Sequence, residues 1–137
     1  MLVYSLPRGG IEDITIKTVV CGDYRKVKAD VKGGSGHFSY VISDEDGVKV
    51  AESDSGDLFI EKPELWSTEH PYLYTLTVKC DGDEYKQKFG VRKVTFDNNG
   101  LYLNDKKVYL KGCGMHEDFF ISGKGNNSAV NLRDFEL

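Results

Sequence analysis

Apolar and polar residues alternate along most of the chain, and a period of two is typical of β-strands with one buried face. Val27, Ala29 and Val31 alternate with charged side chains, and the even positions from 72 to 80 are apolar. Clusters of Asp, Ser and Gly separate such runs, so the sequence predicts many short strands packed as a β-sandwich. The predicted strands span residues 14–20, 25–31, 38–42, 48–51, 58–61, 72–80 and 84–91.

Two hairpins are predicted in the second half of the chain. Asp81-Gly82 joins two predicted strands and is a typical tight-turn pair. Further on, a turn cluster at 97–100 precedes two short apolar runs, 101–103 and 108–110, which flank the polar residues 104–107. That spacing predicts a β-hairpin whose loop is residues 104–107.

The two ends of the chain depart from the strand pattern. Residues 1–10 include Pro7-Arg8-Gly9-Gly10 and predict a linker and turn. Residues 126–128 offer a helix cap, and apolar positions follow at helical spacing up to Leu137. A helix of about ten residues is marginal on its own, and the sequence stops before the helix completes two or three turns. We therefore expect the chain to be a piece of a longer protein.

Length and charge restrict the function. The chain has 137 residues, about one domain, whereas a catalytic (β/α)8 barrel needs about 250. The net charge of −4 with interspersed signs argues against a nucleic-acid partner. No apolar run reaches the roughly 18 residues of a membrane span, and residues 1–4 lack the features of a signal peptide. We expect a cytoplasmic protein with neither a nucleic-acid nor a membrane partner; a signal peptide on the parent would lie outside this sequence.

The three cysteines are expected to be reduced. Cys21 and Cys80, with Trp66 between them, have the separation of the disulfide that joins the sheets of immunoglobulin domains. However, strand parity points Cys80 inward, whereas the inward pair of Ile14 and Ile16 places Cys21 on the opposite face. Free thiols fit a cytosolic protein. Cys113 has no second histidine close by, so we expect a buried structural thiol and not a nucleophile.

The most suggestive polar cluster follows the second hairpin. Gly112-Cys113-Gly114 lets the backbone pass close to other groups, and His116, Glu117 and Asp118 come directly afterwards. A functional site is expected here. A zinc-protease motif would need a second histidine at position 120, which is Phe, and neighbouring side chains on an extended segment diverge. We expect no metal and no cofactor.

Other chemically suggestive residues have structural interpretations. The acidic turn 44–46 offers three side chains, fewer than the six or more oxygen ligands of calcium, so a solvated turn is predicted. Trp66 is expected to close the core, and Tyr72 and Tyr74 are at inward positions, which argues against a sugar-stacking platform. His37 and His70 are isolated and are expected at the surface or in structural hydrogen bonds.

Several motifs occur in a fixed order along the chain. They read Pro63-Glu64-Leu65-Trp66-Ser67, His70-Pro71-Tyr72-Leu73-Tyr74, Phe89-Gly90-Val91-Arg92, Leu103-Asn104-Asp105-Lys106 and Leu110-Lys111-Gly112. Together with His116-Glu117-Asp118 they resemble family-two glycoside hydrolases, where an immunoglobulin-like β-sandwich leads into the catalytic (β/α)8 barrel. The run Gly-Cys-Gly-Met-His-Glu-Asp, with 123–125 and 131–134 after it, is more similar to the β-glucuronidase branch than to the β-galactosidase branch.

The resemblance implies a fold and a function. The fold is an all-β, immunoglobulin-like antiparallel sandwich at 11–96, preceded by a linker at 1–10 and followed by a hairpin and the first segment of a truncated barrel at 97–137. The intact parent hydrolyses terminal β-linked glycosides, β-glucuronides first and β-galactosides second, by a retaining mechanism. Both catalytic glutamates belong to later barrel strands, so this chain has no catalytic residue and is expected to be inactive. Its partners are its own barrel and, in the parent, the glycoside substrate.

The resemblance also gives roles to the polar cluster. His116 binds a substrate hydroxyl in the parent, while Glu117 and Asp118 have supporting or structural roles and are not the catalytic carboxylates.

Two other classes of protein function remain open. A stand-alone carbohydrate-binding module would need a row of exposed aromatic residues, and a protein-interaction module would use bare strand edges. Five apolar residues are expected to pack on the barrel and to leave the isolated tail mobile or self-associating; they are Leu110, Met115, Phe119, Phe120 and Leu132.

Overall fold

The computed structural model describes residues 5–21, 24–112, 114, 123–125 and 127–136. These residues form ten strands and one helix. In chain order the elements are β1 (Ile11–Cys21), β2 (Tyr24–Gly33), β3 (Ser39–Ser43), β4 (Lys49–Ser53), β5 (Asp57–Glu61), β6 (Tyr74–Cys80), β7 (Asp83–Phe89), β8 (Val94–Asp97), β9 (Gly100–Leu103), β10 (Lys106–Val108) and α1 (Ser128–Glu136).

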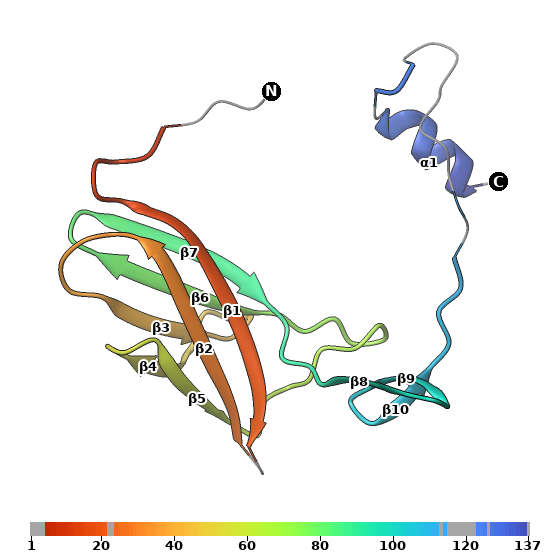
Figure 1. Ribbon diagram of the computed structural model, residues 1–137, viewed down its shortest axis with the longest axis horizontal. Coiled ribbons are helices and arrows are strands. Elements are labelled where there is room, and N and C mark those ends of the chain that lie inside the picture. The colour runs from red at the N-terminus through yellow and green to blue at the C-terminus, as the bar shows by residue number, and fades with distance from the viewer. Residues whose placement is uncertain (1–4, 22–23, 113, 115–122, 126, 137) are drawn as a thin grey trace.

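The first seven strands form a sandwich of two antiparallel sheets. One sheet has the order β1-β2-β5 and the other the order β4-β3-β6-β7. Figure 1 shows these sheets as two layers, with the remaining strands and α1 to one side. The fold is therefore an all-β, immunoglobulin-like sandwich, and the seven strands predicted from the sequence are all present.

Strand parity places the core between the two sheets. On β6, Tyr74, Leu76, Val78 and Cys80 are buried and alternate with more exposed residues. A similar alternation buries one face of β2, β3 and β5, so side chains from both layers meet in a single cluster. Its buried members are Ile11, Ile14, Val27, Ala29, Tyr40, Ile42, Leu58, Ile60, Tyr74, Leu76, Val78, Cys80, Phe89 and Val91.

Three details of the sandwich confirm predictions from the sequence. Cys80 is a free, buried thiol, as its inward parity predicted. Tyr74 is buried, and Tyr72 is partly buried and packs against the core. The Asp44 carboxylate accepts hydrogen bonds from the backbone amides of Asp46 and Val48. The acidic turn is therefore a surface turn that is closed by hydrogen bonds to its own backbone. The side chain of Cys21 and the whole of Cys113 lie outside the described part of the structure.

A third sheet, with the order β10-β9-β8, follows the sandwich. Its hairpin turn is Asn104-Asp105, with φ angles of 51° and 65°, and Lys106 already pairs with Leu103. The predicted four-residue loop was therefore too long, because the left-handed backbone of two residues closes the turn. Strand β8 was not predicted from the sequence at all.

The helix begins as its sequence predicted. The Asn127 side-chain oxygen accepts hydrogen bonds from the amides of Ala129 at 3.1 Å and Val130 at 3.4 Å, which is the N-cap arrangement. Leu132 is exposed on this helix. Among the described residues, no helix is both long enough and apolar enough to cross a membrane.

Candidate functional site

The predicted site residues His116, Glu117 and Asp118 lie outside the described residues. What the structure does describe is the connection that leads toward them. We define the junction as Trp66, Arg92, Lys93, Asn104 and Asp105. These five residues come from three segments that are distant in sequence, and they join the third sheet to the end of the sandwich.

Asn104 is the centre of the junction. Its side-chain amide donates a hydrogen bond to the Trp66 carbonyl oxygen at 3.0 Å, and its side-chain oxygen accepts one from the Lys93 amide at 3.0 Å. Its own backbone amide donates to the Lys93 carbonyl oxygen at 2.8 Å. This one turn residue therefore bonds both to the segment that contains Trp66 and to the segment that contains Lys93. Sequence analysis missed this role, although an Asn-Asp pair between two apolar runs signalled the turn.

Trp66 lies at the junction and not in the core. Its amide donates to the Val91 carbonyl oxygen at 2.9 Å, and the Arg92 guanidinium lies 5.0 Å from its ring centre, which is a cation–π distance. A Cβ atom on Gly90 would lie 2.7 Å from the Trp66 Cβ. Trp66 is only partly buried and is absent from the core cluster. The prediction that it closes the core was wrong, because Trp66 packs against Gly90 and Arg92 at the end of the sandwich and is not part of the core cluster.

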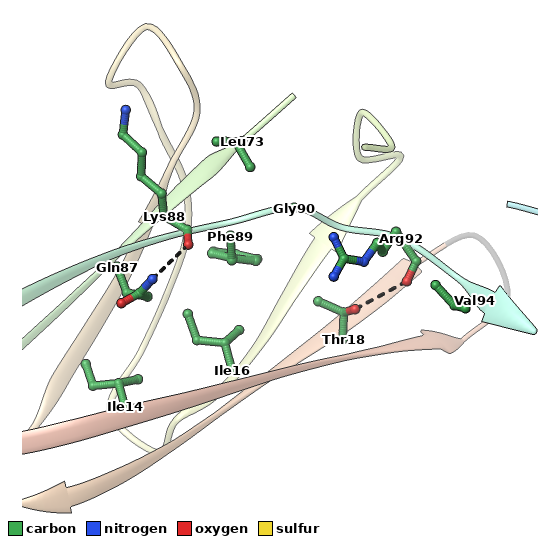
Figure 2. A pocket seen from close by; sticks show the side chains of 10 residues that line it. All are labelled: Ile14, Ile16, Thr18, Leu73, Gln87, Lys88, Phe89, Gly90, Arg92 and Val94. Carbon is green, nitrogen blue, oxygen red and sulfur yellow. Dashed lines mark hydrogen bonds between the residues drawn. The ribbon is translucent and has the colours of Figure 1, made fainter. Parts of the chain in front are cut away.

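A groove of about 620 Å³ lies next to the junction, between the edge strands β1 and β7. Figure 2 shows Ile14, Ile16 and Thr18 pointing from β1 toward the end of β7, which carries Phe89, and the connection after it, which carries Arg92. The Thr18 hydroxyl donates to the Arg92 carbonyl oxygen at 3.5 Å. No carboxylate is among the residues that line this groove. It therefore lacks the acid and nucleophile that glycoside hydrolysis needs.

A second hollow of about 470 Å³ does contain carboxylates. Asp44, Glu61 and Glu64 line it together with Phe59 and aromatic residues of the core edge. Glu61 and Glu64 are exposed to solvent, whereas a general acid needs a desolvated carboxyl group whose pKa is raised. Indeed, within the described ranges no charged side chain is buried. No glycosidase-type pair of carboxyl groups is present in this part of the chain.

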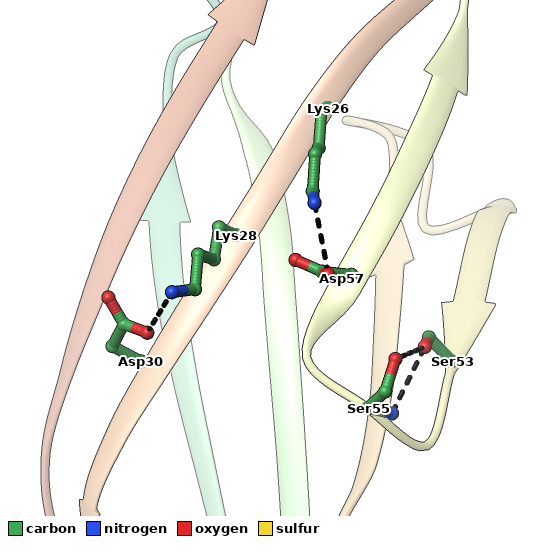
Figure 3. A network of polar contacts seen from close by, with 6 residues as sticks. All are labelled: Lys26, Lys28, Asp30, Ser53, Ser55 and Asp57. Atoms are coloured by element: carbon green, nitrogen blue, oxygen red, sulfur yellow. Dashed lines mark hydrogen bonds and ion pairs between the residues drawn. The ribbon is translucent and has the colours of Figure 1, made fainter.

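The outer face of the β1-β2-β5 sheet carries paired charges. The Lys26 ammonium lies 3.0 Å from Asp57 and the Lys28 ammonium 3.2 Å from Asp30, and Figure 3 shows both pairs. The hydrogen bond from Lys28 holds the pKa of the Asp30 carboxyl below its usual value. On β7, hydrogen bonds from Lys79 and Lys86 lower the pKa of Glu84 in the same way. These shifts are opposite in direction to that of a general acid, so the pairs are structural.

The lowered pKa values predict acid sensitivity. Because Asp30 and Glu84 are more acidic in the folded state, their stabilisation is present above their ordinary pKa values of 3.8 and 4.5 and is lost as the pH falls below these values, through the lowered pKa of each folded-state carboxyl. We expect the thermal unfolding midpoint to fall over this range. The fall should be shallower in the Asp30→Asn, Glu84→Gln double variant. Calorimetry at stepped pH measures the effect, and a double variant with an unchanged slope would contradict it.

Few groups in the described structure are arranged to bind a ligand. Across residues 5–112, apart from 22 and 23, and in the described residues beyond them, no three His, Cys, Asp or Glu side chains are grouped to hold a metal ion. His37 and His70 are exposed, as predicted. Two aromatic residues, Tyr24 and Phe59, are exposed on the outer sheet face; they are diagonal neighbours, and Phe59 lies directly opposite Lys26. This pair is shorter than the aromatic row of a carbohydrate-binding face.

Comparison with known proteins decides the family. The sequence profile described as "Glycosyl hydrolases family 2" matches residues 10–92. The chain belongs to this family. A β-glucuronidase of Streptococcus agalactiae is 35% identical over 96% of the chain, and a β-galactosidase of Staphylococcus xylosus is 30% identical over 98%. The chain covers only 23% and 14% of these relatives, respectively.

Solved structures of family members have the same fold. A β-glucuronidase of Dictyoglomus thermophilum superimposes with a TM-score of 0.82 at 34% identity, over 95% of this chain and 24% of that one. A Ruminococcus gnavus β-glucuronidase in complex with uronic isofagomine gives a TM-score of 0.81 at 36% identity, over 96% of this chain and 23% of that one. The chain thus spans about a quarter of the length of these β-glucuronidases.

Proposed function

We propose that this chain is a non-catalytic part of a longer enzyme that hydrolyses terminal β-linked glycosides, specifically β-glucuronides. The observation that carries the proposal is the match of almost the whole chain to about a quarter of several β-glucuronidases. In this proposal residues 11–96 are a sandwich spacer after a linker at 1–10. Residues 97–137 are a hairpin and the first segment of the catalytic barrel. The β-galactoside class is second, because one β-galactosidase is also similar.

The proposed reaction is a retaining double displacement. It needs a proton donor and a nucleophile about 5 to 5.5 Å apart on a rigid scaffold. The described residues hold no buried carboxyl group, which supports the assignment of both catalytic groups to the rest of the parent. Within this scheme His116 hydrogen-bonds a substrate hydroxyl, and Glu117 and Asp118 hold it in place. The free Cys80 thiol supports a reducing compartment, so we propose the cytoplasm.

An exposed apolar face on the third sheet supports docking to a catalytic barrel. Val94 pairs with Leu103 and Phe96 pairs with Leu101, so these four side chains share one face. Val94 is 55% exposed and Phe96 85% exposed. Apolar residues concentrated on one exposed face mark an interaction surface. We propose that the barrel of the parent covers it, together with the exposed Leu110.

The isolated chain should associate through this face. We expect sedimentation velocity to show a mass that rises with concentration, and Phe96→Glu to abolish the rise because it places a charge at the centre of the contact. Val48→Glu is the matched control, since Val48 is an exposed apolar residue in the β3–β4 connection and is not part of the third sheet. A chain that stays monomeric at all concentrations, or a Phe96→Glu variant that associates as before, would refute the assignment.

A sugar titration separates the proposal from its main alternative. As a stand-alone carbohydrate-binding module, the chain would use Tyr24 and Phe59, the exposed aromatic pair on the outer sheet. We expect no amide shift changes when glucuronic acid, a β-glucuronide or a β-galactoside is added to the isolated chain up to millimolar concentration. Saturable shifts around these two residues, removed by Phe59→Ala, would favour the binding module instead.

A further inference from the structure

The third sheet is attached to the sandwich without shared strand pairing. Its order is β10-β9-β8, and none of these strands is hydrogen-bonded to a strand of the other two sheets. A sheet attached by a single connecting segment would be free to rotate about it. The orientation of the third sheet therefore depends on contacts outside the strand ladders, and Asn104 supplies contacts of this kind.

We propose that Asn104 is a positioning residue, whose side chain fixes the orientation of the β9–β10 hairpin relative to the sandwich. Its amide group donates to the Trp66 carbonyl oxygen and accepts from the Lys93 amide, both at 3.0 Å. The two partners belong to different segments, and Trp66 is itself tied to Val91. The side chain thus ties the hairpin turn to the β5–β6 connection of the sandwich at Trp66, and to the segment that leads into β8 at Lys93.

The chemistry of the site selects asparagine at this position. The backbone has a φ of 51°, which asparagine and glycine tolerate better than most residues. Only an amide side chain of this length presents both a donor and an acceptor. Aspartate would keep the acceptor for Lys93 but would face the Trp66 carbonyl with a second oxygen. Glycine would keep the backbone geometry but would lose both side-chain bonds.

Asp105 provides the matched control. It occupies the other turn position, with a φ of 65°, and its exposed carboxylate pairs only at the surface with the Lys93 ammonium. Exposed ion pairs contribute little to stability. Asn104→Gly and Asp105→Gly therefore remove one side chain each from the same left-handed turn. The two variants differ in whether the lost side chain bonds to the sandwich backbone.

The test uses the isolated chain. Residual dipolar couplings of the sandwich amides and the hairpin amides should fit one alignment tensor in the unchanged protein and in Asp105→Gly. In Asn104→Gly the hairpin should need a separate alignment tensor of smaller magnitude. The Lys93 amide should exchange with solvent about tenfold faster, because it loses its hydrogen bond to the Asn104 side chain. Asn104→Asp should give intermediate exchange at Lys93. These measurements do not depend on the proposed enzymatic function.

Two results would overturn the proposal. One is a single alignment tensor with unchanged Lys93 exchange in Asn104→Gly. The other is equal loosening in Asp105→Gly, which would assign the effect to turn geometry and not to the amide. Circular dichroism checks that each variant keeps its strand content, and the isosteric Asn104→Asp variant remains informative if the glycine variant unfolds.

A second experiment rests on the proposed function and asks whether the orientation serves the reaction. In the full-length parent, Asn104→Gly should lower kcat/KM for a β-glucuronide about tenfold through displacement of the segment that carries His116. In a His116→Ala background the same change should have no further effect, since the residue that it positions is gone. Additive losses would show that Asn104 acts only on stability. A parent without glycosidase activity would refute the proposed function and leave the dipolar-coupling result intact.

Discussion

Replacing Leu76 with alanine should lower the free energy of unfolding by about 2–5 kcal/mol. Leu76 is fully buried on β6, and it pairs with Ile42 on one side and with Gln87 on the other. A cavity at this point lies between the two layers of the sandwich. Small domains have total stabilities of about 5–15 kcal/mol, so this single change should remove a large part of the stability. Urea unfolding, followed by far-ultraviolet circular dichroism, measures it.

Leu132→Ala is the matched control for Leu76→Ala. Leu132 is the same residue type but lies exposed on α1. Its replacement should change the unfolding free energy by less than about 0.5 kcal/mol. If the two variants lost similar stability, or if Leu76→Ala lost less than about 1 kcal/mol, the core would not be centred between β3, β6 and the opposite sheet.

Replacing His116 with alanine should lower kcat/KM of the full-length parent about a hundredfold on a β-glucuronide. The reason is that hydrogen bonds to sugar hydroxyl groups strengthen in the transition state and supply several kcal/mol. The loss should be larger in kcat/KM than in ground-state affinity for the product sugar. Steady-state kinetics with a chromogenic substrate and a product-binding titration give both quantities.

His70→Ala is the control for that experiment. His70 lies in the same chain, is exposed on the connection between β5 and β6, and contacts the ring of Tyr72. Its loss should leave the kinetics unchanged. A His116→Ala enzyme with normal kcat/KM would remove the proposed role of this residue, and an equal loss in both variants would indicate a general defect in folding.

The sandwich was predictable from the sequence because its information is local. The alternation on β2 and β6 determines which side chains face inward, and the structure buries Val27, Ala29, Leu76 and Val78 accordingly. The free Cys80 thiol followed from the same parity. A period of two is imposed by the backbone of a strand, so it survives in the sequence wherever one face is buried.

The junction was not predictable in the same way because its bonds are non-local. Asn104 and Trp66 are 38 positions apart, and nothing in their immediate neighbours indicates that they meet. Trp66 was assigned to the core from its residue type and its position between two prolines at a corner of the sandwich, whereas Gly90 and Arg92 are the residues that it packs against. Strand β8 was missed although its residues Val94–Asp97 alternate apolar and polar, because a run of 4 residues is a weak strand signal. An exposed apolar face such as that of β8 and β9 can be recognised as a docking surface only when the strand pairing is known.

The candidate site itself was predictable only as a resemblance. Two glycines before His116-Glu117-Asp118 signal a close backbone approach. However, a histidine next to two carboxylates does not define a reaction unless the groups on the other side of the site are known. The structure describes the path up to Gly112 and the junction that orients it. The proposed function assigns the catalytic carboxyl groups to parts of the parent outside this sequence.

The most direct test is the hydrolysis of a chromogenic β-glucuronide by this chain, compared with the same chain extended through a complete barrel. The proposed function predicts turnover by the extended protein alone, with no activity above background from the isolated chain at any concentration. Turnover that scales with the concentration of the purified chain and disappears on His116→Ala would contradict the non-catalytic role. An extended protein that hydrolyses no β-glycoside would contradict the proposed parent.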